Sequence, residues 1–194
     1  RPPLSSSSAA SDVYKRQLLF YLFFETTLIP MFFLIGGFGG ERRRYAAIKF
    51  LLYSLTSGLV MLAAVIGLYV NAHNNGHGTF LLSDLMNMSM GTNTERWLFV
   101  GFMIAFAVKA PMFPVHTWLP DAAENTTPGG AVMMVAIMDK IGTFGMFRFC
   151  LSLFPKAADW ATPVIIVLAV ISIIYGALAA LAQENMMRLV AYTS

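Results

Sequence analysis

The sequence predicts an all-α protein, a polytopic transmembrane helix bundle with about five membrane spans, one of them broken near Lys109. Of the 194 residues, 57% are hydrophobic and 12% are charged, whereas an ordinary soluble domain carries about 25% charged residues. Apolar stretches of about 20 residues, enough to cross the hydrocarbon core of a bilayer, recur between short polar breaks. Within residues 97–120 a lysine stands two residues ahead of a proline, which predicts an interrupted helix.

The chain divides into a short first segment and a membrane domain. Residues 1–17 are rich in Pro and Ser, lack the apolar core of a signal peptide and resemble translated cloning sequence, so we expect a non-native or disordered segment. Residues 18–194 form the membrane domain. We expect its spans at residues 18–38, 45–70, 97–120, 129–154 and 163–182. The last residues turn from polar to apolar, which indicates the start of another helix.

The first two spans carry a few residues that are unusual in lipid. Glu25 is the only charge in the first span, and Pro30 is expected to kink that helix because it removes one backbone hydrogen bond. The second span has small or hydroxylated residues in its first half, namely Ser54, Thr56, Ser57 and Gly58. Such residues either let helices approach closely or line a hydrated path, and both interpretations stay open.

The charge balance and the cysteine count exclude several classes of function. The formal charge is +3, but most basic residues lie in turns between spans, so orientation in the membrane explains them better than nucleic-acid binding does. With residues 1–17 set aside, the positive-inside rule puts the basic turn at residues 39–44 inside. Cys150, the single cysteine, is expected to be a small buried residue, so disulfides, iron-sulfur clusters, haem and zinc sites are not encoded. His73 and His77 enclose Asn-Asn-Gly, which favours a solvated turn over a metal site.

Each of the following ionisable residues falls inside a predicted span: Glu25, Lys109, Asp139 and Lys140. A lysine near the middle of a span costs roughly 2.5 to 3.5 kcal/mol, so its presence needs a reason. One interpretation is a structural ion-pair network that ties helices together. The other is a proton or ion relay, because such groups usually face the bundle interior or a wet cavity.

The prolines after Lys109 are expected to expose backbone carbonyls. Pro111 and Pro114 lack an N–H, so the carbonyls of Ala107 and Ala110 lose their ordinary helix partners. Free carbonyls at membrane depth are tolerated where they line a water-filled cavity, and transporters use broken helices at their ion sites.

His116 follows Lys109 by seven residues. In a continuous helix it would share the face of Lys109, about 10.5 Å further along. It is either a member of a proton relay or a satisfied histidine at the membrane interface, and the sequence does not separate the two.

Several stretches together resemble a known family. They are FFETTLIPMFFL, FAVKAPMFPVHTWLPDAAENTTPG, GTFGMFRFCLSLFP and YGALAALAQENMMRLVAYTS. They resemble the chain M family of antiporter-like membrane subunits of proton-translocating NADH-quinone oxidoreductase, respiratory complex I. The resemblance runs from about residue 18 to residue 194 and covers only a central part of such a subunit, so we expect a fragment.

The resemblance implies roles for individual residues. Glu25 would be the carboxylate paired with Lys109 on the broken helix, and Lys140 the central lysine that passes the proton onward. His116 matches the histidine of the family's HxWLPDA motif. Asp139 is not part of the general family pattern and points about 100° away from Lys140 along a helix, so we expect it to tune the lysine.

The function implied is that of a membrane-arm subunit that translocates protons, driven by electron transfer from NADH to quinone in partner subunits. The chain itself would hold no cofactor; NADH, FMN, iron-sulfur clusters and quinone would belong to those partners. Its other partners would be further membrane-arm subunits and the lipid bilayer of a bacterial inner membrane, with no nucleic acid. The alternatives are the large subunit of a multisubunit sodium/proton antiporter and a structural membrane anchor whose charges pin helices together.

Overall fold

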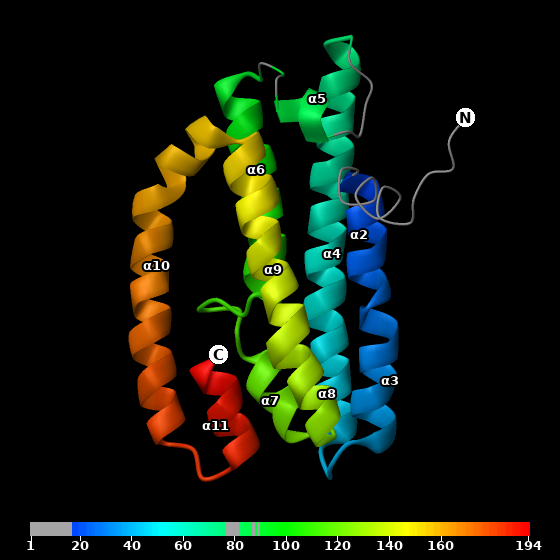
Figure 1. Ribbon diagram of the computed structural model, residues 1–194, viewed down its shortest axis with the longest axis vertical. Helices are drawn as coiled ribbons and strands as arrows, with labels where there is room; N and C mark the ends of the chain where they lie inside the picture. Colours follow the sequence, from blue (N-terminus) through cyan, green and yellow to red (C-terminus); the bar gives the residue numbers. More distant parts are fainter. Residues whose placement is uncertain (1–16, 77–81, 87, 89) are drawn as a thin grey trace, which may run out of the picture.

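The computed structural model is a bundle of long helices that stand side by side (Figure 1), and it describes residues 17–76, 82–86, 88 and 90–194. The described residues form helices and turns without strands, which confirms the predicted all-α bundle. The helices are α2 (Gln17–Thr26), α3 (Leu28–Phe38), α4 (Arg43–Asn74), α5 (Leu82–Met86), α6 (Thr92–Lys109), α7 (Trp118–Glu124), α8 (Pro128–Met133), η1 (Met134–Met138), α9 (Asp139–Gly145), η2 (Met146–Leu151), α10 (Pro155–Leu181) and α11 (Met186–Thr193). The proposed non-native segment, residues 1–16, and His77 of the proposed solvated turn lie outside the described residues.

The first predicted span is divided into α2 and α3 by a turn at Thr27. Pro30 explains the position of the turn. It has no N–H to donate to the carbonyl of Thr26, four residues earlier, so the α-helical ladder is interrupted one turn before the proline. The kink expected from Pro30 is therefore present, and it falls two residues after Glu25.

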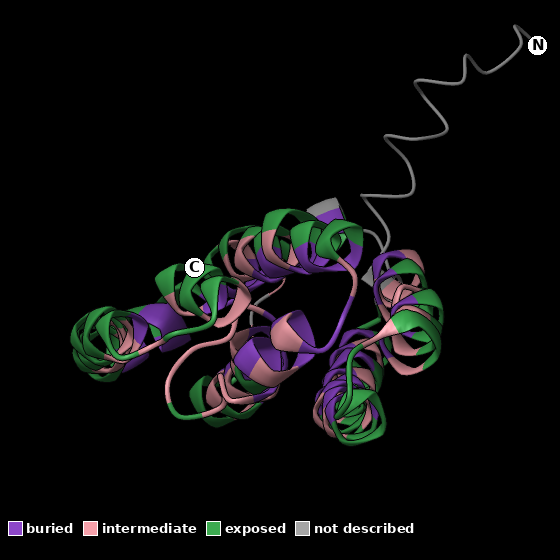
Figure 2. Ribbon diagram, turned by 90° about the horizontal axis from the view of Figure 1, so that it is seen from below, coloured by how far each residue is buried: buried purple, intermediate pink, exposed green. Residues whose placement is uncertain are grey.

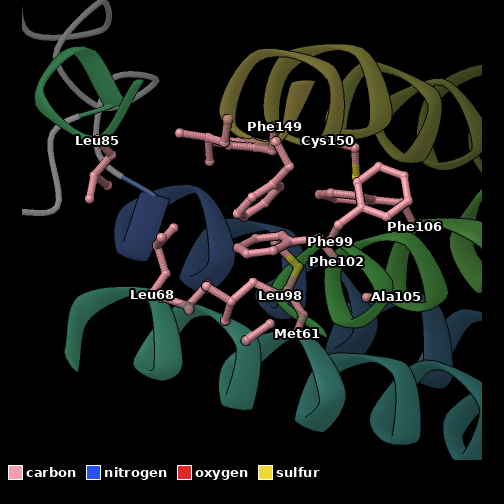
Figure 3. Packing of buried hydrophobic residues seen from close by; sticks show 14 of the residues in the cluster. Met61, Leu68, Leu85, Leu98, Phe99, Phe102, Ala105, Phe106, Phe149 and Cys150 are labelled. Carbon is pink, nitrogen blue, oxygen red and sulfur yellow. The ribbon is translucent and has the colours of Figure 1, made fainter. Parts of the chain in front are cut away.

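The core lies between α4, α6 and the helical rod that runs from α8 to η2. Figure 3 shows Met61 of α4, Phe102 and Phe106 of α6, and Phe149 of η2 pointing toward one another. The ring of Phe149 stacks on both α6 rings, at centroid distances of 6.4 Å to Phe102 and 6.1 Å to Phe106. Cys150 is buried beside them, as expected for a small apolar residue.

The fourth predicted span is one rod, but not a regular one. Two π-helical segments, η1 and η2, stand on either side of α9, which begins at Asp139. Apolar periodicity does not distinguish π turns from α turns, so these segments could not be predicted from the pattern of residues. Single π turns are rare and occur often at functional sites.

The fifth span begins eight residues earlier than predicted, because α10 starts at Pro155 and not after a loop. Proline is tolerated in the first turn of a helix, where its missing N–H has no helical partner in any case. Glu95 of α6 is buried, and its Oε1 accepts a hydrogen bond from the N–H of Ala157 at 3.1 Å. This carboxylate satisfies one of the unpaired N–H groups of the first turn of α10 and ties α10 to α6.

Four helical segments have the length and composition to cross a membrane: Leu18–Phe38, Arg43–Asn74, Pro128–Leu151 and Pro155–Leu181. The predicted third span is shorter than expected, since α6 has 18 residues, begins with a polar turn and ends at Lys109. The outer faces of the helices are exposed (Figure 2). Many large apolar side chains lie on them, such as Ile173 of α10, which is exposed by 70%. An apolar surface of this extent is typical of contact with lipid. The expected helix at the end of the chain is α11.

Candidate functional site

Helix α6 ends at Lys109 because Pro111 cannot continue it. The N–H of Ala110 donates the last α-helical bond, to the Phe106 carbonyl at 2.7 Å. The Ala107 carbonyl then accepts from the N–H of Met112 at 2.9 Å, one residue beyond the proline. The Ala107 carbonyl therefore loses its ordinary helix partner, as expected, but it is not left free as the sequence suggested, because the chain widens its turn and Met112 supplies a bond.

Side chains from other elements hold the break in place. The indole Nε1 of Trp118 donates to the Val108 carbonyl at 2.8 Å, and the N–H of Phe113 donates to Ser172 Oγ of α10 at 2.9 Å. Trp118 is 1% exposed and is also the first residue of α7. Trp118, which begins α7, thus donates a hydrogen bond to a carbonyl in the last turn of α6.

Lys109 is buried at this end of α6, with 1% of its surface exposed. Its Nζ has no hydrogen-bond partner among the described residues and lies 4.8 Å from the ring centroid of Phe24. Glu25, the next residue of α2, interacts electrostatically with it, and Glu25 Oε1 is likewise buried without a hydrogen-bond partner in the described parts. The site thus contains a lysine and a glutamate that interact electrostatically, and neither Lys109 Nζ nor Glu25 Oε1 has a hydrogen-bond partner among the described residues.

Lys140 lies in the first turn of α9, and 65% of its side chain is exposed. Its Nζ is 3.1 Å from Oδ2 of Asp139, the preceding residue. Asp139 is buried, and the same oxygen accepts a hydrogen bond from Ser194 Oγ at 2.7 Å. Two neighbouring residues of a helix point in different directions, but the long lysine side chain still reaches the carboxylate.

Helix α9 packs against the break in α6 through Gly142, two residues after Lys140. Gly142 packs against the backbone there, because a methyl group at Gly142 would lie 2.7 Å from the Ala110 nitrogen and 3.2 Å from the Lys109 carbonyl carbon. A cavity of about 670 Å³ between α2 and α9 is lined by Lys140 and by Phe24 and Thr27, which flank Glu25 in the sequence. Lys140 thus lines the same cavity as two sequence neighbours of Glu25, while Glu25 and Lys109 are not among the described residues that line it.

His116 lies in the turn between α6 and α7, and not on a continuation of the Lys109 face. The seven-residue spacing therefore does not place it as a continuous helix would. Its ring contacts those of Tyr175 and Phe113, at centroid distances of 5.0 and 5.9 Å. Both ring nitrogens are buried, and the ring lines a cavity of about 390 Å³ with Tyr192.

The structure also contains a charged cluster that the sequence interpretation did not use. Asp121 of α7 pairs with Lys49 of α4 at 2.7 Å and with Arg188 of α11 at 3.4 Å. Glu124 of α7 pairs with Arg188 at 3.0 Å and with Arg42 at 3.3 Å. The signal was present in the motif WLPDAAE, where Asp and Glu stand three residues apart and so share one helix face. No group of three or more His, Cys, Asp or Glu side chains suited to a metal lies together in the described ranges.

A family model described as NADH:quinone oxidoreductase/Mrp antiporter, TM, matches residues 15–194. The chain belongs to this family. It is 56% identical over 164 residues to NADH-quinone oxidoreductase subunit M of Mycobacterium tuberculosis. The aligned region covers 80% of this chain and 29% of that protein. It is 44% identical over 156 residues to subunit M of Escherichia coli K12, covering 80% of the chain and 31% of that protein.

Solved structures of the family have the same fold. A chain of respiratory complex I from Thermus thermophilus with bound NADH is 38% identical, with a TM-score of 0.84 over 92% of this chain and 38% of that one. A chain of the Mrp complex from Dietzia sp. DQ12-45-1b is 20% identical, with a TM-score of 0.79 over 92% of this chain and 33% of that one. The chain thus spans about a third of the length of the family members it matches.

Proposed function

We propose that the chain is part of a membrane-arm subunit of NADH-quinone oxidoreductase and that protons pass through Glu25, Lys109 and Lys140, with His116 as a further member of the relay. The observation that carries the proposal is the buried Lys109 Nζ, which has no hydrogen-bond partner in the described residues, beside the buried Glu25 Oε1. An ionisable group in a membrane domain is a functional candidate by default. The names of the relatives in Mycobacterium tuberculosis and Escherichia coli support the assignment to the oxidoreductase.

The proposed mechanism uses the weak pairing of Glu25 and Lys109. While the carboxylate lies near Lys109, its charge favours the protonated amine. Electron transfer from NADH to quinone in partner subunits shifts this pairing, and Lys109 then passes its proton toward Lys140. Repeated cycles move protons outward against the membrane potential, at about 2.3 kcal/mol per charge for each 100 mV.

The redox chemistry in this proposal belongs to the partner subunits. NADH, FMN, the iron-sulfur clusters and quinone are bound there, and this chain supplies the proton path of the translocase. The chain is a multi-pass protein of the bacterial inner membrane. The apolar outer surface supports contact with lipid and with neighbouring membrane-arm subunits.

Two alternatives come from the same residues. The family also includes Mrp antiporters, so sodium/proton exchange is the second candidate. A structural anchor would use its charges to pin helices together, as Lys49 and Asp121 do at 2.7 Å. Lys109 differs from such a pin because its Nζ makes no hydrogen bond to a described residue. This difference favours a mobile charge.

The variant Glu25→Gln is expected to impair proton translocation and to leave NADH oxidation possible, because glutamine keeps the shape of the side chain but carries no charge to pair with Lys109. The measurement is NADH-driven proton uptake by inverted membrane vesicles that contain the full complex, with NADH oxidation followed in parallel. Glu41→Gln, at an exposed position in the turn before α4, is the matched control and should behave as the unmodified complex.

The same vesicles separate the alternatives. Full coupling in the Glu25→Gln complex would remove Glu25 from the proton path. Sodium-dependent proton exchange without NADH would support the antiporter. If every charge variant assembled and pumped normally, the charges would be structural.

A further inference from the structure

Gly58 of α4 lies directly against the carboxylate of Glu25. A methyl group at Gly58 would have three nearest neighbours, and all three are carboxylate atoms: Oε2, Cδ at 2.5 Å and Oε1 at 2.7 Å. Contacts this short do not occur, so any side chain at this position would displace the carboxylate. The carboxylate occupies space that exists only because residue 58 is glycine.

This contact differs from the usual reason for glycine between packed helices. At Gly101 the nearest atom to an added methyl group would be Ala64 Cβ at 2.9 Å, and at Gly142 it would be the backbone nitrogen of Ala110. Those two glycines let one helix approach another. At Gly58 the nearest atoms are the charged end of a side chain, so close helix packing does not explain the glycine.

The contact between α4 and α6 puts Gly58 about one half-turn of helix from the level of Lys109. Gly67 of α4 faces Leu98 of α6, and Ala64 of α4 faces Gly101 of α6. The residue number falls by three on α4 while it rises by three on α6, so the two helices run antiparallel. Continuing this register brings Lys109 level with Thr56, between Ser54 and Gly58. Ser54 is fully buried, and its hydroxyl has no hydrogen-bond partner among the described residues. The buried face of α4 therefore carries an unpaired hydroxyl one turn from the glycine that meets the Glu25 carboxylate.

We propose that Gly58 is a positioning residue that holds the Glu25 carboxylate against α4, close to the depth of Lys109, and so sets how strongly the two charges interact. A side chain at position 58 would turn the flexible end of Glu25 away from this place. Coulomb energy varies with the distance between charges, so the displacement changes the balance between the protonated and neutral amine of Lys109. The inference rests on the proposed proton path and names a part of it that carries no proton itself.

The test uses the complete oxidoreductase carrying Gly58→Ala in the full-length subunit. Alanine favours a helix over glycine by about 1 kcal/mol, so assembly should be retained. NADH-driven proton uptake should fall by up to about 10²-fold, the loss that a displacement of about 1 Å can cause. The pH profile of the remaining uptake should also shift. Gly67→Ala is the matched control on the same helix, because its methyl group would meet only a Leu98 side-chain carbon, at 3.1 Å.

A second variant separates positioning from a general packing effect. Aspartate is one methylene shorter than glutamate, so adding Glu25→Asp to Gly58→Ala should make room for the new methyl group and restore part of the lost proton uptake. Failure of Gly58→Ala to assemble, unchanged uptake and pH profile, or a double variant no better than Gly58→Ala would each overturn the positioning role. If Glu25→Gln pumps normally, the proposed function fails whatever Gly58→Ala does. If Glu25→Gln is impaired and Gly58→Ala is not, only the positioning role fails.

Discussion

Lys109→Ala is expected to reduce NADH-driven proton uptake by the full complex by roughly 10²-fold or more, the range that a positioned proton donor or acceptor contributes to a transfer. The amine belongs to a buried lysine at the break in α6, and it interacts electrostatically with Glu25. Without it the carboxylate has no cation to pair with, and the proton has no station before Lys140. The measurement is proton uptake in vesicles, normalised to the amount of assembled complex.

A companion variant shows whether a loss arises from chemistry or from packing. Lys109→Met keeps most of the side-chain volume and removes the charge, so it should lose proton uptake while the complex assembles normally. Lys156→Ala removes an exposed lysine at the start of α10 and should leave uptake unchanged. Normal coupling with Lys109→Met would mean that the amine does not carry protons.

Trp118→Ala is expected to cause the largest loss of stability in the site, about 3 to 5 kcal/mol for a buried tryptophan. The side chain is 1% exposed, packs on the Phe50 ring at a centroid distance of 5.4 Å and donates to the Val108 carbonyl. Its removal leaves a cavity and an unpaired carbonyl beside Lys109. Thermal unfolding of the purified full-length subunit in detergent measures the effect.

The conservative variant divides this loss into two parts. Trp118→Phe keeps an aromatic ring and removes the hydrogen bond to Val108, so it should cost about 1 to 3 kcal/mol, the usual cost of an unsatisfied buried group. Trp97→Ala, at a position that is 77% exposed, is the control and should change the unfolding temperature little. A Trp118→Ala subunit as stable as this control would show that the indole does not hold the break together.

Much of the fold could be predicted because its causes are local in the sequence. Long apolar stretches predicted the helices, Pro30 predicted the interruption of the first span, and Pro111 predicted the end of α6 at Lys109. The start of α10 was predicted wrongly because its cause is not local. Glu95, 62 residues before Ala157 in the chain, satisfies the N–H group at the start of that helix.

The site was predictable in its residue types and less so in its geometry. A charge inside an apolar span singles out Glu25 and Lys109, whatever the fold. The close approach of Gly58 to Glu25 depends on how neighbouring helices pack, and one sequence on its own does not specify that packing. The wider turn that recovers the Ala107 carbonyl likewise depends on how the chain adapts to the proline.

In the proposed mechanism, Lys109 acts by gaining and losing a proton and not as a fixed positive charge. The most direct test is the number of protons taken up per NADH oxidised by vesicles that contain the Lys109→Arg complex. Arginine keeps the charge but does not release its proton in proteins, since its pKa is above about 12. We expect the ratio to fall as far with Lys109→Arg as with Lys109→Ala. A ratio equal to that of the unmodified complex would contradict this mechanism and make Lys109 a fixed charge.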